Sequence, residues 1–401
     1  MYLIKREDCL KQIRPFIKTD IIKVLTGMRR CGKSAMLELI KAELLENGAD
    51  ETSFICYNFE NMSFSKLCNA EALRKDIIKR CRKHKGKLHF FLDEIQEVDG
   101  WEKCINSIRV EFDSDIYITG SNSRLLSGEL ATYLAGRYVE FVVFPFSFKE
   151  FSLLNENKSL DRREAFKKYV KFGGMPYLWN LDFREQPVNQ YLRDLFNAVE
   201  IKDIVRRNKI RDVDMLERMI TYISSNIGMT FSATSIAKFM KSQARKIVPE
   251  TILNYLKYCV DAFLFYKVKR NDLAGKQLLT TNEKYYLADH ALATAVETNS
   301  NVDINSILEN IVFVELKRRG YSVTVGKYDN KEIDFVCEKD NLKSYLQVCY
   351  ILASDDTINR EFGSLLSIKD NYPKYVLSLD EFDFSRNGIV HKNLIDWLLE
   401  S

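Results

Sequence analysis

The stretch that decides the fold lies near the N-terminus and reads Gly27-Met28-Arg29-Arg30-Cys31-Gly32-Lys33-Ser34. It fits the pattern G-x-x-x-x-G-K-[ST], in which the glycines allow a tight turn whose N–H groups face phosphate oxygens. An apolar run at 21–25 precedes it, and apolar residues at helical spacing follow from Lys33 to Gly48. The stretch therefore predicts a phosphate-binding loop between a strand and a helix. Lys33 would lie on the β- and γ-phosphates and Ser34 would be a ligand of Mg²⁺.

Two carboxylates follow a second apolar run, in the stretch Phe90-Phe91-Leu92-Asp93-Glu94. Asp93 suits a partner of Mg²⁺, and Glu94 suits a general base that deprotonates an attacking water. Acidic residues are also common at helix starts, so the pair alone would fit a helix cap equally well. The phosphate loop earlier in the chain favours the catalytic interpretation.

Two further polar residues flank later strands. Asn122 follows the apolar run 116–118, and ligands of open α/β sheets bind at the carboxyl ends of strands, so its amide could reach the γ-phosphate or the water. Arg137 precedes the run 138–144 and could act on the γ-phosphate of a neighbouring subunit. The structural alternatives are a turn residue at 122 and a surface arginine paired with Glu140.

These motifs, in this order, resemble the AAA+ superfamily of P-loop ATPases. The whole chain is similar to a prokaryotic AAA family whose C-terminal half is a conserved domain of unknown function. The stretches that carry the second resemblance are Phe172-Gly173-Gly174-Met175-Pro176, Lys284-Tyr285-Tyr286-Leu287-Ala288-Asp289, Glu309-Asn310-Ile311-Val312, Glu332-Ile333-Asp334-Phe335 and Gln347-Val348. The resemblance implies ATP and Mg²⁺ as cofactors. A second sensor arginine has no clear place in the sequence, and Arg162, Arg163 and Arg184 are the candidates.

The pattern of elements predicts an α/β protein in four parts. Strands alternate with helices over 1–145, which predicts a parallel P-loop sheet with helices on both faces. Helical patterns over 146–213 predict a lid or connector, and three helices with a hairpin over 214–289 predict a winged helix-turn-helix. Residues 290–401 predict a further α/β unit that resembles restriction endonucleases.

That last unit invites a comparison with PD-(D/E)xK nucleases. Glu309, Asp334 and Gln347 resemble their acidic scaffold, which holds Mg²⁺ beside a lysine two residues past the last acid. Here Cys349 takes the lysine's position, and Gln347 removes one anionic ligand. Lys331 or Lys343 could replace the lysine. We expect a degenerate, binding-only unit rather than an active nuclease.

The winged-helix segment is the basic part of the chain. The net charge is +4 in total, but residues 201–300 carry 16 basic and 10 acidic groups, whereas residues 301–401 carry 12 and 17. Along the helix that starts near Pro249, Ile252, Leu253 and Leu256 are expected in the core. The residues expected to contact DNA are Arg245, Lys246, Asn254 and Lys257. A protein-binding winged helix with a solvated basic face is the alternative.

The rest of the composition bounds the setting. Nine cysteines occur without a Cys-x-x-Cys pair and four histidines lie far apart, which favours reduced thiols and argues against structural zinc. Neither a signal peptide nor an apolar run long enough for a membrane is visible, so we expect a cytoplasmic protein without a membrane partner.

The sequence thus predicts an Mg²⁺-dependent ATPase that acts on a DNA-associated partner or substrate, with homo-oligomers through Arg137 in trans. A nucleotide-gated interaction module with little turnover and an ATP-regulated nuclease are the alternatives.

Overall fold

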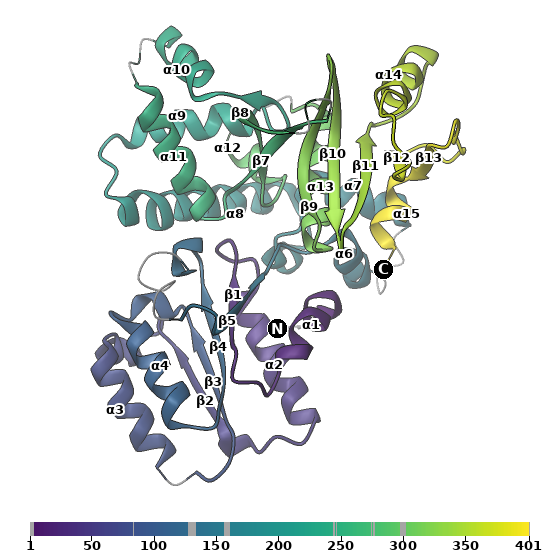
Figure 1. Ribbon diagram of the computed structural model, residues 1–401. Coiled ribbons are helices and arrows are strands. Elements are labelled where there is room, and N and C mark those ends of the chain that lie inside the picture. The colour runs from purple at the N-terminus through teal and green to yellow at the C-terminus, as the bar shows by residue number, and fades with distance from the viewer. Residues whose placement is uncertain are drawn as a thin grey trace. The chain divides into compact units, whose positions relative to one another are not determined.

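The computed structural model describes residues 4–82, 84–126, 134–155, 161–243, 245, 247–273, 275, 277–296 and 302–400 (Figure 1). The chain forms two compact units. Unit 1 comprises residues 1–144 with 261–263, and unit 2 comprises 145–260 with 264–401. Within the described residues, no helix is both long and apolar enough to cross a bilayer.

Unit 1 is built on a five-stranded parallel sheet in the order β2-β3-β4-β1-β5. The strands are β1 Ile22–Thr26, β2 Phe54–Asn58, β3 Leu88–Asp93, β4 Ser114–Gly120 and β5 Tyr138–Val142. The α-helices are α1 Glu7–Ile13, α2 Lys33–Glu46, α3 Ala70–Cys81 and α4 Trp101–Glu111. Short 3₁₀ turns occupy Arg14–Phe16, Glu51–Ser53, Met62–Leu67, Ile95–Glu97 and Ser123–Leu126. The predicted α/β fold with a parallel sheet is confirmed.

Apolar side chains on both faces hold this sheet in place. One face packs against α3 and α4, where Val24, Phe90 and Ile118 share a buried cluster with Leu73 and Ile105. Helix α2 covers the other face, and α1 lies on the same side (Figure 1). Each fully buried side chain of this size stabilises the fold by about 1.5–3 kcal/mol.

A buried polar network ties three of these strands together at their amino ends. The Asp115 carboxylate accepts hydrogen bonds from the Tyr117 hydroxyl at 2.9 Å and from His89 Nδ1 at 3.1 Å, and it pairs with the Lys23 ammonium. Burial raises the pKa of Asp115, but the hydrogen bond from His89 and the charge of Lys23 outweigh it and hold the pKa below its usual value. The polar groups of this network pair with one another. The network lies at the amino ends of the strands, away from the edge where ligands of such sheets bind.

Unit 2 combines helices with an eight-stranded sheet in the order β13-β12-β11-β10-β9-β7-β8-β6. Its helical elements are α6 Phe148–Asn155, α7 Arg162–Phe172, the 3₁₀ turn Pro176–Leu181, α8 Glu185–Ala198, a π-helix Val199–Arg206, α9 Val213–Ser224, α10 Ala233–Ser242, α11 Pro249–Asp261, α12 Leu292–Val296, α13 Ile304–Arg318, α14 Asp355–Leu366 and α15 Leu394–Leu399. Its strands are β6 Thr230–Phe231, β7 Phe265–Asp272, β8 Gln277–Leu287, β9 Ser322–Tyr328, β10 Lys331–Lys339, β11 Leu342–Val348, β12 Lys374–Ser378 and β13 Val390–Asn393.

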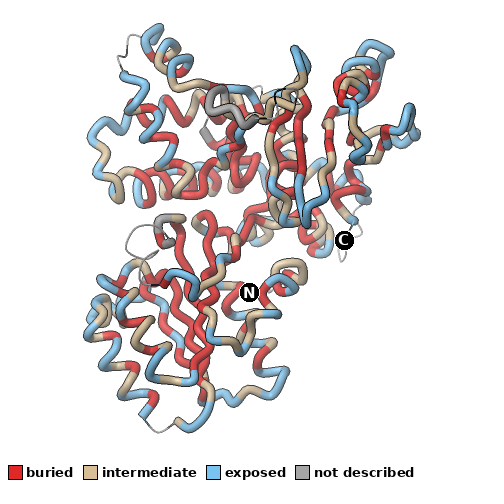
Figure 2. Tube along the Cα trace, viewed as in Figure 1, coloured by how far each residue is buried: buried red, intermediate tan, exposed pale blue. Residues whose placement is uncertain are grey.

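One sheet runs through the two parts expected at 214–289 and 290–401. Strand β7 pairs with β8 in an antiparallel hairpin and with β9 in parallel, in the register Arg270↔Val325. The β9 pairing satisfies backbone groups that an isolated hairpin would leave exposed at its edge. Buried segments accordingly continue from the hairpin into β9, β10 and β11 (Figure 2). The four-part division stays a prediction.

Candidate nucleotide site

The loop from Gly27 to Gly32 joins β1 to α2 and has a backbone that only certain residues permit. Gly27 has φ +142°, and a Cβ there would lie 2.3 Å from the Val143 carbonyl oxygen. Gly32 has φ 104° and is the N-cap of α2, where it has no side chain to cap the first turn. The N–H groups at this helix start are therefore available to an anion, which the helix dipole also favours.

Lys33 is held over the loop that it follows. Its ammonium donates to the carbonyl oxygens of Gly27 and Met28, each at 3.2 Å, and lies 3.6 Å from Oε1 of Glu94. The side chain is only 4% exposed. Two neutral carbonyls orient this lysine, and the charges of Glu94, at 3.6 Å, and of the nearby Asp93 neutralise it in part. An ammonium held in this way suits a group that must attract phosphate.

Asp93 is the last residue of β3, and hydroxyl and amide donors surround its carboxylate. Its carboxylate accepts from Thr119 Oγ1 at 2.6 Å and from Asn58 Nδ2 at 3.1 Å. Burial raises the pKa of Asp93, while hydrogen bonds from Thr119 and from Ser34 oppose the rise. The Ser34 hydroxyl and the Asp93 carboxylate are thus adjacent, and hard oxygen donors of this kind suit Mg²⁺, which takes one or two protein ligands beside phosphates.

Glu94 follows in a strained conformation. Its φ of 54° is in the left-handed region, which costs a non-glycine residue of this size on the order of 1–3 kcal/mol. Its backbone N–H donates to Thr119 Oγ1 at 2.8 Å, and its carboxylate accepts from Gln96 Nε2. Thr119 therefore fixes both acidic residues through one oxygen.

Three polar residues of this site escaped the sequence reasoning: Asn58, Gln96 and Thr119. Asn58 ends β2 and Thr119 lies near the end of β4, so the strand order β2-β3-β4 brings both of them beside Asp93. Gln96 lies in the turn directly after β3, two residues past Glu94. Thr119 carried the one available signal, because it stands at the end of the same strand that placed Asn122.

Asn122 and Arg137 lie at opposite ends of the sheet. Asn122 is 2% exposed, two residues past the end of β4, at the edge where Thr26 and Gly120 pair and where the loop begins. The Arg137 carbonyl accepts from the N–H of Ile22 at 2.9 Å, at the start of β1. A five-residue strand spans about 16 Å, so Arg137 is remote from the loop of its own chain.

The side chain of Arg137 is exposed, and its guanidinium donates to Asn106 Oδ1 at 3.0 Å. Glu140, the partner considered for it, instead accepts from Thr26 Oγ1 at 2.6 Å. Among the lid candidates, Arg162 pairs with Asp396 and Arg163 with Glu381 within unit 2.

In unit 2, the nuclease-like residues meet around a lysine that the sequence did not single out. The Lys284 ammonium lies 2.8 Å from Glu309 Oε1 and 2.8 Å from Glu332 Oε1. The Asp334 carboxylate accepts from the N–H of Val348 at 2.8 Å, while its own N–H donates to Gln347 Oε1 at 3.3 Å. Glu309, Asp334 and Gln347 thus lie in one cluster, and their role as a degenerate nuclease site stays a prediction.

The cation of this cluster is Lys284. Burial lowers the pKa of Lys284, but the charges of Glu309, Asp334 and Glu332 outweigh it and raise the pKa, so the ammonium stays charged. The two lysines considered earlier contact other groups: Lys331 donates to Gly363 O, and Lys343 pairs with Glu338. In the described ranges, no set of three or more His, Cys, Asp or Glu side chains is arranged to hold a metal ion.

The residues expected to contact DNA differ in their surroundings, and the contact itself stays a prediction. Asn254 and Lys257 are exposed on α11. Leu253 is 51% exposed rather than buried, because it lies on the same solvent side of the helix as Asn254. Arg245 forms an ion pair with Asp214 at 2.8 Å, and Lys246 lies outside the described residues.

Comparisons with known proteins agree with the geometry of unit 1. A family described as an AAA domain matches residues 19–152, and a domain of unknown function matches residues 163–303. An uncharacterized protein of Haemophilus influenzae is 37% identical over 404 residues, which cover 99% of each chain. The chain belongs to the AAA+ P-loop ATPases. As an AAA+ P-loop ATPase, it carries its whole candidate nucleotide site inside the matched AAA domain.

Two further relatives extend the comparison. An uncharacterized protein of Methanocaldococcus jannaschii is 31% identical over 345 residues, covering 82% of this chain and 75% of that one. The Walker-type ATPase PABY2304 of Pyrococcus abyssi is 17% identical with a TM-score of 0.49, covering 74% of this chain and 96% of that one. The family assignment rests on the sequence matches, and a structural likeness of this size adds no functional argument.

Proposed function

We propose that this AAA+ protein binds ATP with Mg²⁺ at the loop 27–34, hydrolyses it, and uses the resulting conformational change on a DNA-associated partner. The observation that supports it best is the placement of Lys33, whose ammonium is bound by loop carbonyls beside Glu94 and is not saturated by carboxylates. A nucleotide phosphate supplies the missing negative charge.

Each residue then has a defined task. The loop N–H groups and Lys33 bind the β- and γ-phosphates, and Ser34 with Asp93 would hold Mg²⁺, which neutralises phosphate charge when bound. Glu94 accepts the proton of the attacking water as the β–γ bridging bond breaks and ADP leaves. Thr119 and Gln96 orient Glu94, and Asn122 contacts the γ-phosphate or the water.

ATP titration calorimetry tests the binding step. We expect Lys33→Ala to weaken ATP binding at least about 100-fold, in line with the 1.5–3 kcal/mol of charged hydrogen bonds plus the lost charge. Lys41→Ala is the matched control, because Lys41 lies on the same helix over the Phe54 ring, at 5.5 Å. Equal affinities of the Lys33 and Lys41 variants would refute the proposal.

A mixing experiment tests the role of Arg137 between subunits. Glu94→Gln lacks the base but offers an intact arginine, and Arg137→Ala lacks the arginine but keeps the base. If Arg137 acts in trans, each variant alone is nearly inactive, whereas the mixture recovers part of the hydrolysis at mixed interfaces. A mixture no more active than the mean of its parts would exclude action in trans.

The DNA contact is proposed for α11, whose exposed Asn254 and Lys257 lie in the basic segment of the chain. We expect Lys257→Glu to weaken binding of duplex DNA and to reduce the slope of affinity against salt by about one charge or more. Lys369→Glu makes the same charge change on the exposed surface of the acidic part of the chain. Equal losses in both variants would contradict a specific role for α11.

A further inference from the structure

Arg6 is a buried arginine that the catalytic scheme does not use. It immediately precedes α1 and is only 3% exposed. Its Nη1 donates to the Cys31 carbonyl oxygen at 3.2 Å and its Nη2 to the Phe144 carbonyl oxygen at 2.9 Å. All three residues belong to unit 1. One guanidinium thus joins the N-terminal segment, the phosphate loop and the end of the sheet.

The contact with Cys31 sets the direction of a phosphate-binding amide. A trans peptide is planar, and its C=O and N–H point to opposite sides. Because Arg6 holds the Cys31 oxygen, the N–H of Gly32 is turned away from Arg6. Gly32 has φ 104° and no Cβ, so its own backbone offers little resistance to rotation of this peptide. The guanidinium supplies the constraint that the glycine lacks.

The contact with Phe144 links this peptide to the segment after β5. Val143 donates to the Thr26 carbonyl at 2.7 Å, and its own carbonyl oxygen occupies the space beside Gly27. The segment 143–144 therefore contacts the start of the loop directly at Gly27 and is connected to its end through Arg6, which binds Cys31.

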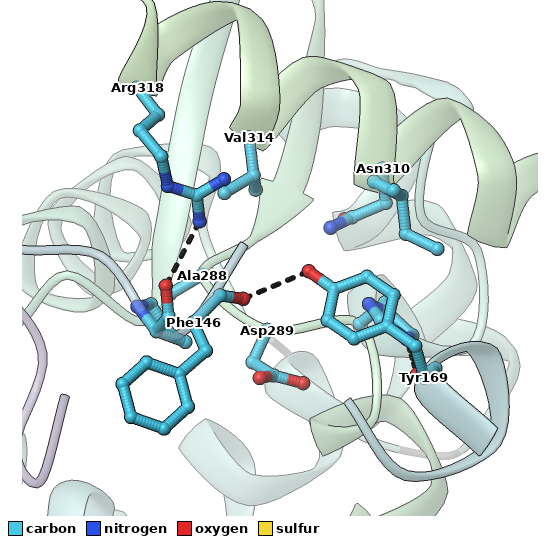
Figure 3. A pocket seen from close by; sticks show the side chains of 10 residues that line it. Phe146, Tyr169, Ala288, Asp289, Asn310, Val314 and Arg318 are labelled. Carbon is cyan, nitrogen blue, oxygen red and sulfur yellow. Dashed lines mark hydrogen bonds between the residues drawn. The ribbon is translucent and has the colours of Figure 1, made fainter. Parts of the chain in front are cut away.

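Pro145 and Phe146, which follow Phe144, form backbone hydrogen bonds inside unit 2. Arg318 Nη2 donates to the Pro145 carbonyl at 2.9 Å, and the Tyr169 hydroxyl donates to the Phe146 carbonyl at 3.0 Å (Figure 3). Phe146 also donates to Gly174 O at 2.7 Å. Each side of the junction between Phe144 and Pro145 is thus hydrogen-bonded within its own unit.

We propose that Arg6 is a positioning residue of the nucleotide site, which presets the Cys31–Gly32 peptide for phosphate and ties it to Phe144 at the exit from unit 1. The inference rests on the proposed ATP site. Phosphate binding to the Gly32 amide then reduces the opening of the backbone in the segment 143–146, through which the chain enters unit 2. A guanidinium is charged at all relevant pH values, so the link does not titrate.

The test compares ATP affinity in Arg6→Gln, Arg6→Lys and Arg14→Gln. Arg14 belongs to the same N-terminal segment and pairs with Glu7 and with Glu43 on α2, without contacting the loop. We expect Arg6→Gln to weaken ATP binding roughly tenfold to a hundredfold, the worth of charge-assisted hydrogen bonds. Arg6→Lys, which keeps the charge but cannot span both carbonyls, should lie between. Arg14→Gln should bind within about twofold of wild type.

Hydrogen exchange of the Val143, Phe144 and Phe146 amides gives a second readout that general destabilisation would not imitate. A non-hydrolysable ATP analogue should slow their exchange in wild type and in Arg14→Gln, but not in either Arg6 variant at saturating nucleotide. Millimolar guanidinium ion should restore affinity to Arg6→Ala by filling the vacated site, and should not restore it to Lys33→Ala.

The outcomes separate the two claims. If wild type binds no ATP, the proposed function fails. If wild type binds ATP and the Arg6 and Arg14 variants bind it equally well, the inference about Arg6 is overturned. Should Arg6→Gln and Arg6→Ala fail to fold, Arg6→Lys decides: unchanged affinity together with unchanged protection of the segment 143–146 overturns it.

Discussion

Two buried lysines of this protein lie beside carboxylates, and their surroundings differ in one respect. Lys33 in unit 1 is bound by two neutral carbonyl oxygens, with Glu94 at 3.6 Å. Lys284 in unit 2 is bound by two carboxylates at 2.8 Å, beside a third, Asp334. Both ammonium groups are 4% exposed, so burial does not distinguish them.

Charge balance distinguishes them. The first lysine keeps part of its charge for an incoming anion, at a helix start that also attracts one. The second is neutralised by its own protein, and the Tyr286 hydroxyl further occupies Glu309. Taking charges out of water is costly unless they are paired. We call a cluster saturated when carboxylates of the same chain balance its lysine. Such a cluster stabilises the fold, whereas a lysine that is not fully balanced can bind an anion.

The largest effect should follow from breaking the saturated cluster. Lys284→Met leaves the buried Asp334 and the half-buried Glu309 and Glu332 without this cation, and it should destabilise unit 2 by about 3 kcal/mol, while ATP affinity in unit 1 stays unchanged. Chemical denaturation monitored with ATP titration measures both. Lys343→Met, which breaks the exposed pair with Glu338, should cost less than about 1 kcal/mol. Similar losses of unfolding free energy in the two variants would show that the carboxylates around Lys284 do not depend on its charge.

A buried carboxylate without a cation sharpens the comparison. Glu200 in the π-helix is 5% exposed, and its Oε1 has no hydrogen-bond partner among the described residues. Burial, with the charge of Glu217, raises the pKa of Glu200 from 4.5 to about 7.

Because the folded pKa is the higher one, Glu200 destabilises the fold as pH rises from about 4.5 through 7. Above pH 7 the cost is on the order of 3 kcal/mol. Glu200→Gln should therefore stabilise unit 2 at pH 8, and the gain should disappear at pH 4.5. Denaturation curves at the two pH values measure it, and a gain that is independent of pH would contradict the assignment.

A smaller effect is expected at the nucleotide site. Thr119→Val removes the hydroxyl that joins Asp93 to the Glu94 amide but keeps the side-chain volume. We expect kcat to fall roughly tenfold to a hundredfold, as for other groups that orient catalytic residues, with ATP affinity nearly unchanged. Thr119→Ser should restore most of the rate. Loss of affinity without loss of kcat would assign Thr119 to binding instead.

The sequence predicted those parts of the site that are contiguous. The loop 27–34 and the pair Asp93-Glu94 each carry their chemistry in one short stretch, and the apolar strands around them impose the α/β fold. The strand order was not available, so Asn58 and Thr119 could not be joined to Asp93 before the structure placed β2 and β4 on either side of β3. Gln96 is close to Glu94 in the sequence, but nothing in the sequence shows which way a turn residue points.

The same reason explains what was missed in unit 2 and at the N-terminus. The nuclease pattern places its lysine two residues past Gln347, where this chain has Cys349, and Lys331 and Lys343 were the expected substitutes. The cation of the cluster instead comes from β8, far away in the sequence. The position of Arg6 beside the loop could not be predicted from the sequence. Its partners are the backbone carbonyls of Cys31 and Phe144, and every residue has such a group.

Phosphate release from ATP by wild type and by Glu94→Gln tests the central claim most directly. The account predicts Mg²⁺-dependent turnover in wild type, a fall of at least about 100-fold in the variant, and ATP binding retained in both. Wild type that binds ATP but releases no more phosphate than Glu94→Gln would contradict it and leave a nucleotide-gated switch in its place.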